Sequence, residues 1–192
     1  MAKDYDFLPD EDSSGNFDKL LPSQGQRFGL LRWTLFGVLV LLALLVQDSL
    51  VYLLDIYGAG ADLVPCVIIM IAALQGAEAG SLFSLITALL FYYSGSAPGP
   101  YVVAMIPILA VFVAIFRQAR LRRGFFSILL ATAMGMLLYE LALFGWGLFW
   151  KLTTPNRFSS AMLTAAMSLA ALPIAYPIAR AISKIGGEPW KE

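Results

Sequence analysis

The chain has no histidine, and Cys66 is its single cysteine among 192 residues. Histidine is the commonest general base and metal ligand, so its absence argues against a zinc site, a histidine-ligated haem and histidine-based catalysis. Cys66 cannot form a disulfide within the chain, and its neighbours in LVPCVII indicate a small buried side chain. We therefore expect no cofactor, no metal and no enzymatic centre.

Charge is also scarce. Only 14% of the residues are charged, 59% are hydrophobic, and the mean hydropathy is +0.76. A soluble domain carries about 25% charged residues, so this chain has too little polar surface to cover a water-soluble globule. The composition predicts an integral membrane protein. Its net charge of zero gives no indication of nucleic-acid binding.

The polar residues gather at the start of the chain. Residues 1–26 are rich in aspartate, which predicts a disordered acidic tail in the cytoplasm and no cleavable signal peptide. This tail is either a solvated leader or a segment that docks onto a partner. Residues 27–185 are predicted to form the membrane domain, followed by a short cytoplasmic tail over 186–192.

Six apolar segments follow the tail. A membrane-spanning helix needs about 20 residues, and the candidates cover 33–54, 59–74, 77–93, 101–116, 125–150 and 158–179. The second is doubtful, because its uninterrupted apolar part would reach only about 18 Å as a helix. Pro173 and Pro177 should kink the last segment. We expect an all-α, six-helix transmembrane bundle.

The basic residues support six spans. Cytoplasmic loops of membrane proteins collect lysine and arginine. With both termini in the cytoplasm, Lys151 and Arg157 alone of the 13 basic residues lie outside. A re-entrant second segment would move the arginines after residue 116 to the outer surface. The expected topology therefore places the amino and carboxyl termini both in the cytoplasm.

The stretch QGAEAGSLFSLITALLFYYSGSAPGPY, residues 75–101, contains two turns. Gly76 and Gly80 are four residues apart, a spacing that lets helices approach closely in lipid, and Glu78 lies between them. This corner is either a helix-packing or partner-docking site, or an ordinary tight turn. In SGSAPGP, Gly95, Pro98 and Gly99 favour a reversal at the outer surface.

Glu140 is the only acid deep inside an apolar segment. An ionisable group there costs about 2.5 kcal/mol or more, so it should face the bundle interior or a partner helix. Alternatively, it binds a proton or substrate in a transporter. Asp48 and Asp62 are expected near the outer surface.

The segment FRQARLRR, residues 116–123, places four arginines in one short inner loop. They are expected to contact anionic lipid or an acidic cytoplasmic partner, at about 1 kcal/mol per basic residue. The simpler alternative is that they only fix the topology. The four are Arg117, Arg120, Arg122 and Arg123.

Residues 63–123 resemble the bacterial rod shape-determining protein MreD family. A proline-led apolar helix precedes a two-glycine corner, a second helix ends at a serine-glycine and proline-glycine turn, and arginines close a third helix. The residues at these places are Pro65, Gly76, Gly80, Gly95, Pro98, Gly99, Arg120 and Arg122. The chain departs from the family at Tyr92 and Tyr93, where an aspartate is frequent.

The resemblance implies a non-enzymatic subunit of the cell-elongation machinery, which makes peptidoglycan. Such a subunit binds the single-span protein MreC, and through it the peptidoglycan polymerase and transpeptidase pair and the MreB filament. It also implies a fold similar to the substrate-binding S-components of energy-coupling-factor transporters. A vitamin-binding S-component is accordingly the alternative function. A membrane-embedded enzyme would need catalytic residues that the sequence does not show.

Overall fold

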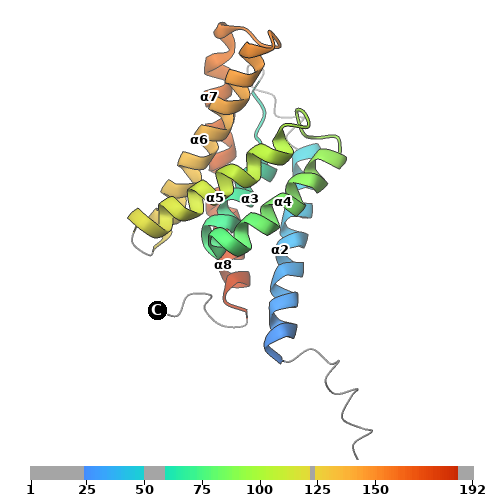
Figure 1. Ribbon diagram of the computed structural model, residues 1–192, viewed down its shortest axis with the longest axis vertical. Coiled ribbons are helices and arrows are strands. Elements are labelled where there is room, and N and C mark those ends of the chain that lie inside the picture. The colour runs from blue at the N-terminus through green and yellow to red at the C-terminus, as the bar shows by residue number, and fades with distance from the viewer. Residues whose placement is uncertain (1–23, 50–58, 122–123, 186–192) are drawn as a thin grey trace, which may run out of the picture.

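The computed structural model describes residues 24–49, 59–121 and 124–185, and these residues fold into helices joined by short connections (Figure 1). In chain order the elements are α2 (Gln24–Ser49), α3 (Leu63–Gln75), α4 (Ala77–Tyr93), α5 (Val102–Arg120), α6 (Phe125–Phe149), the 3-10 turn η3 (Pro155–Arg157), α7 (Phe158–Ala170) and α8 (Leu172–Ser183). Residues 1–23 of the predicted acidic tail and the predicted C-terminal tail lie outside the described residues, whereas residues 24–26 of the predicted acidic tail are the start of α2.

Length and apolar composition identify the helices that can cross a membrane. Three of the described helices, α2, α5 and α6, are long and apolar enough to do so, and the α7–α8 pair makes a fourth if its 47° bend is part of one span. Helices α3 and α4 are apolar but shorter, with 13 and 17 residues. The all-helical class predicted from the sequence is confirmed for the described residues, with three or four helices that could span a membrane, whereas the count of six spans is not confirmed.

Helix α3 forms the centre of the bundle. Every residue from Val64 to Gln75 is buried, and α3 packs against each of the other described α-helices (Figure 1). Its length is roughly 20 Å at 1.5 Å per residue, against about 30 Å for the hydrocarbon core of a bilayer. Because Val64 and Gln75 are both buried, neighbouring protein groups must satisfy the free backbone groups at the two ends of α3.

Neighbouring side chains cap both ends of α3. At the N-terminal end, the Val64 N–H donates to Gln47 Oε1 of α2 at 3.0 Å, and the Asp62 N–H donates to Ser168 Oγ of α7 at 2.7 Å. At the C-terminal end, the Arg117 guanidinium of α5 donates to the Ala73 carbonyl. A cation at that end also opposes the negative pole of the helix dipole. These bonds fix three surrounding helices onto α3.

The two-glycine corner joins α3 to α4. Gly76 adopts a φ of 94°, in the region that glycine occupies without strain. At Gly80 a Cβ atom would lie 2.8 Å from the Ala72 Cα, so only glycine allows the two helices to approach this closely. The corner is a packing element within the chain. Glu78 is exposed beside it.

The last apolar segment is broken between α7 and α8. Pro173 stands in the first turn of α8 and Pro177 inside that helix. A proline in a continuous helix would clash with the carbonyl four residues earlier, so the chain bends at Ala171 instead. The kink predicted from these prolines is confirmed.

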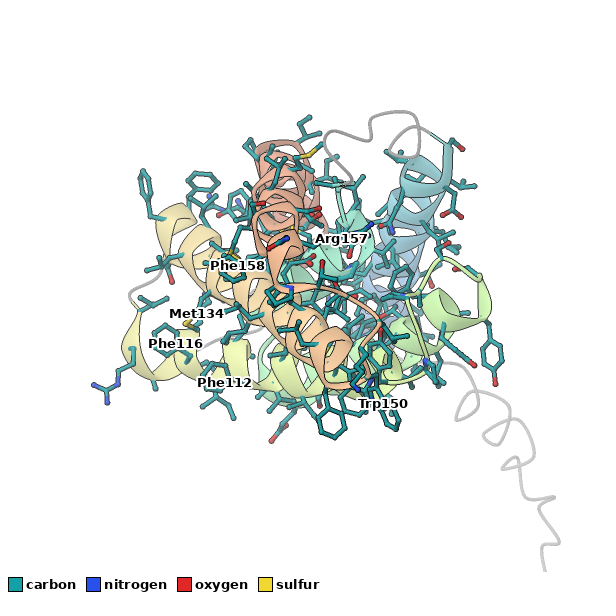
Figure 2. All side chains as sticks on the ribbon, turned by 90° about the horizontal axis from the view of Figure 1, so that it is seen from above. Phe112, Phe116, Met134, Trp150, Arg157 and Phe158 are labelled. Carbon is teal, nitrogen blue, oxygen red and sulfur yellow. The ribbon has the colours of Figure 1, made fainter. Side chains whose placement is uncertain are left out.

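Large apolar side chains cover much of the outer surface. Phe112 and Phe116 stack on each other along α5, with ring centroids 6.5 Å apart, and Phe112 is half exposed (Figure 2). Leu82 on α4 and Ile108 on α5 are about two-thirds exposed. Such a surface suits lipid tails, which take the place of water around a membrane protein.

We expect the substitution Gly80→Ala to lower the melting temperature of the purified protein in detergent. The new Cβ would collide with the Ala72 backbone, and overpacking of this kind costs about 1–3 kcal/mol. Gly37→Ala on α2 is the matched control, because a Cβ there meets nothing within 4 Å. Equal melting temperatures for the two variants would contradict the close α3–α4 contact.

Candidate functional site

Glu140 lies on α6 inside the bundle. Its side chain is 5% exposed, and its Oε1 atom is buried without a hydrogen-bond partner among the described residues. The interior position agrees with the cost of placing an acid against lipid.

Asp62 is the second acid at this site. Its carboxyl group lies close enough to the carboxyl group of Glu140 for the two to interact. The sequence predicts a position at the outer surface for Asp62, but the residue is half-buried, and its backbone N–H donates to Ser168. Two ionised carboxylates in contact repel each other, so a proton or a cation must lie between or beside them. No local sequence pattern indicated this pair, because an acid just before a helix is ordinarily exposed.

Tyr139 adds a buried hydroxyl next to the acids. It is 0% exposed, and its hydroxyl group has no hydrogen-bond partner among the described residues. It lies close enough to Asp62 and Glu140 for their charges to act on it. The positive pole at the N-terminus of α3 faces the same region, since Asp62 is the residue before that helix.

A pocket of about 230 Å³ opens beside Glu140. Two helix faces form its walls, each with the i, i+3, i+4, i+7 spacing that aligns side chains along one side of a helix. Helix α6 contributes Glu140, Leu143, Phe144 and Gly147, and the facing wall consists of Arg157 at the end of η3 with Ser160, Ala161 and Thr164 of α7. Pro98, Tyr101 and Thr153 complete the lining.

The SGSAPGP turn forms one side of this pocket. A Cβ on Gly99 would lie 2.4 Å from the Tyr101 ring, so glycine leaves room for that ring. The Tyr101 ring packs on Trp146 at a centroid distance of 5.4 Å. Ser96 donates to Asp48 Oδ1 at 2.7 Å, which attaches the turn to the end of α2. Gly95, with a φ of 82°, makes the reversal possible.

The residues singled out from the sequence fall at the two ends of α3. Pro98 and Glu140 line the pocket near its N-terminal end, with Gly95 and Gly99 in the adjoining turn. Gly76, Glu78, Gly80 and Arg117 lie at its C-terminal end. Arg120 is exposed at the end of α5, and Arg122 and Arg123 lie outside the described residues. The structure therefore brings Pro98 and Glu140 into one pocket and separates them from the arginines.

We expect Asp62→Ala and Glu140→Ala each to destabilise the protein by about 1–3 kcal/mol, because each leaves the other buried carboxyl group without its partner. The double variant should cost less than the two single effects together, and thermal unfolding in detergent measures all three. Glu78→Ala, which removes an exposed acid, is the control and should have little effect. Additive single effects would show that the two carboxyl groups do not interact.

The interpretation of the site rests on its geometry, because comparison with known proteins gives no guide to it. Family models, curated proteins and solved structures give no match to this chain. The described features are a multi-pass helical bundle, a carboxyl pair at the N-terminal end of its central helix, and a pocket with an acid at one end. These features favour binding and assembly as the activity to be tested.

Proposed function

We propose that this protein is a non-enzymatic scaffold subunit of the bacterial cell-elongation machinery. It lies in the cytoplasmic membrane with six apolar helices in the bilayer and both termini in the cytoplasm. It binds an MreC-like single-span protein. Through that partner it joins the peptidoglycan polymerase and transpeptidase pair and the MreB filament. Its mechanism is assembly: packed helices hold the partners in register, and no covalent bond is made or broken.

The observation that carries this proposal is the structural use of the MreD-like residues. Gly76 permits the turn between α3 and α4, Gly80 allows these two helices to touch, and Gly99 makes room for the Tyr101 ring. Each of these glycines meets a specific steric demand of the α3–α4–α5 unit. A shared pattern of residues under such demands supports a shared fold better than a similar composition would.

The distribution of polar groups also supports a scaffold function over an enzymatic function. The described connections between helices are short. The polar side chains of Gln47, Ser168 and Arg117, from three helices, hold the two ends of α3. A scaffold needs such internal rigidity, because it must present fixed helix faces to its partners.

The second candidate is the substrate-binding subunit of an energy-coupling-factor vitamin transporter. The pocket beside Glu140 favours it, because a buried acid in a pocket is a common feature of ligand sites. Pockets for drug-sized ligands measure about 300–1,000 Å³, and this one measures about 230 Å³. The pocket is small for a vitamin, so the scaffold remains the preferred function.

Purification of the tagged chain from its native bacterium in mild detergent tests the two functions. We expect a single-span protein with a coiled-coil segment to co-purify, and depletion of the chain to make rod-shaped cells round. Mass spectrometry of the co-purified proteins is the measurement. A co-purified pair of ATPases would favour the transporter instead. The absence of both kinds of partner, with normal cell shape after depletion, would overturn the scaffold proposal.

Single-cysteine labelling tests the orientation. Cys66 is the only cysteine and is 1% exposed, so Cys66→Ala gives a background without reactive thiols. In that background, Arg122→Cys should react with a membrane-impermeant maleimide only after the cells are opened, because arginine-rich loops stay in the cytoplasm. Asn156→Cys, beside the pocket, should react in intact cells. Labelling of Arg122→Cys in intact cells would disprove the proposed topology.

A further inference from the structure

The pocket is a groove with opposite charges at its two ends. Helices α6 and α7 are joined by the turn that contains η3 and pack against each other, so their chains run in opposite directions (Figure 1). Glu140 on α6 therefore shares the inner end of the groove with Thr164, and Gly147 shares the outer end with Arg157. Glu140 and Gly147 are seven residues apart, which places the two ends about 10 Å from each other along the helix.

The acid at the inner end requires a donor. Glu140 is 5% exposed, its Oε1 atom is buried and accepts no hydrogen bond from the described residues, and its carboxyl group also contacts Asp62. A group with both a positive charge and N–H donors, bound where Glu140 lines the pocket, hydrogen-bonds with its carboxyl group and removes the repulsion within the carboxyl pair. A primary ammonium has these properties, whereas a quaternary ammonium has the charge but no N–H.

The outer end requires an anion. Arg157 is exposed at the pocket mouth, and a guanidinium group binds phosphate through a fork of N–H donors (Figure 2). A ligand that carries both an ammonium and an anionic group, a zwitterion, therefore matches the acid at one end of the groove and the guanidinium at the other.

The size and depth of the pocket agree with such a ligand. At about 30 Å³ per water-sized group, its volume of about 230 Å³ holds roughly eight non-hydrogen atoms, which is the size of ethanolamine phosphate. Trp146 and Trp150 flank the outer end of α6, and their rings pack 6.3 Å apart. Tryptophan and tyrosine mark the level of the lipid headgroups.

We propose that this groove binds the ethanolamine phosphate group, with its primary ammonium at Glu140 and its phosphate at Arg157. The group is either the headgroup of a phosphatidylethanolamine lipid or a free molecule of the same chemistry. Thr164 and Ser160 line the groove between the two charges and provide hydroxyl groups along it. This binding goes beyond the scaffold function and does not depend on it.

Thermal unfolding of the full chain in detergent, cleared of native lipid, tests the proposal with soluble probes. Ethanolamine phosphate should raise the melting temperature. Choline phosphate, which lacks N–H donors, and inorganic phosphate, which lacks the cation, should bind about tenfold more weakly or worse. Equal stabilisation by choline phosphate would overturn the assignment of the ammonium to Glu140.

Paired variants locate the site. Glu140→Gln and Arg157→Gln should each weaken binding of ethanolamine phosphate by about tenfold or more. Their controls, Glu78→Gln and Lys151→Gln, remove an exposed acid and the other outer cation at positions that do not line the pocket, and should bind like the unaltered chain. Arg157 is exposed, so its variant reports on binding even where Glu140→Gln does not fold. Binding that is unaffected by Arg157→Gln would refute the site.

Native mass spectrometry from lipid nanodiscs distinguishes a lipid headgroup from a free molecule as the source of the bound ethanolamine phosphate group. Retention of phosphatidylethanolamine in preference to phosphatidylcholine and phosphatidylglycerol, and its loss in Arg157→Gln, would identify a lipid headgroup. Stabilisation by soluble ethanolamine phosphate without lipid selectivity would identify a free ligand. The absence of both effects would refute the proposal while leaving the scaffold function untouched, because partner co-purification is measured independently.

Discussion

The main structural constraint on this protein is a buried helix whose length is less than the thickness of a bilayer. Helix α3 has 13 residues and reaches roughly 20 Å, so its terminal N–H and carbonyl groups remain inside the bundle. An unsatisfied backbone group in such a place costs several kcal/mol. Gln47, Ser168 and Arg117 supply partners from three different helices. The arrangement of the bundle follows from this need to satisfy both ends of one central helix.

The same constraint creates the candidate site. Fixing the N-terminal end of α3 against α7 places the Asp62 carboxyl against Glu140 on α6. The positive pole of the helix is an environment that favours negative charge, so the acids gather where α3 begins. The α6–α7 hairpin then leaves a pocket beside Glu140 that Arg157 borders on the outside. A structural requirement and a potential binding site thus share one end of one helix.

Several features could be predicted from the sequence because they depend on local chemistry. Gly76 and Gly80 lie four apart at a close helix contact, and Pro173 lies where the last apolar segment bends. Burial of Glu140 followed from the cost of an acid in lipid. The position of Asp62 could not be predicted, because an acid just before a short apolar helix is ordinarily exposed. Its burial depends on Ser168, which lies 106 residues away in the chain.

The sequence by itself determined the class of this protein: apolar runs and few charges require a helical membrane protein, since only hydrogen-bonded helices hide the backbone polar groups of such segments from lipid. It also indicated the close contact between α3 and α4 and the break between α7 and α8, since glycine and proline act on their immediate neighbours. The tertiary structure alone decided that α3 is enclosed by the other helices and that Asp62 meets Glu140. Both depend on helix packing between segments distant in the chain, and residue spacing within one helix contains no information about its neighbours.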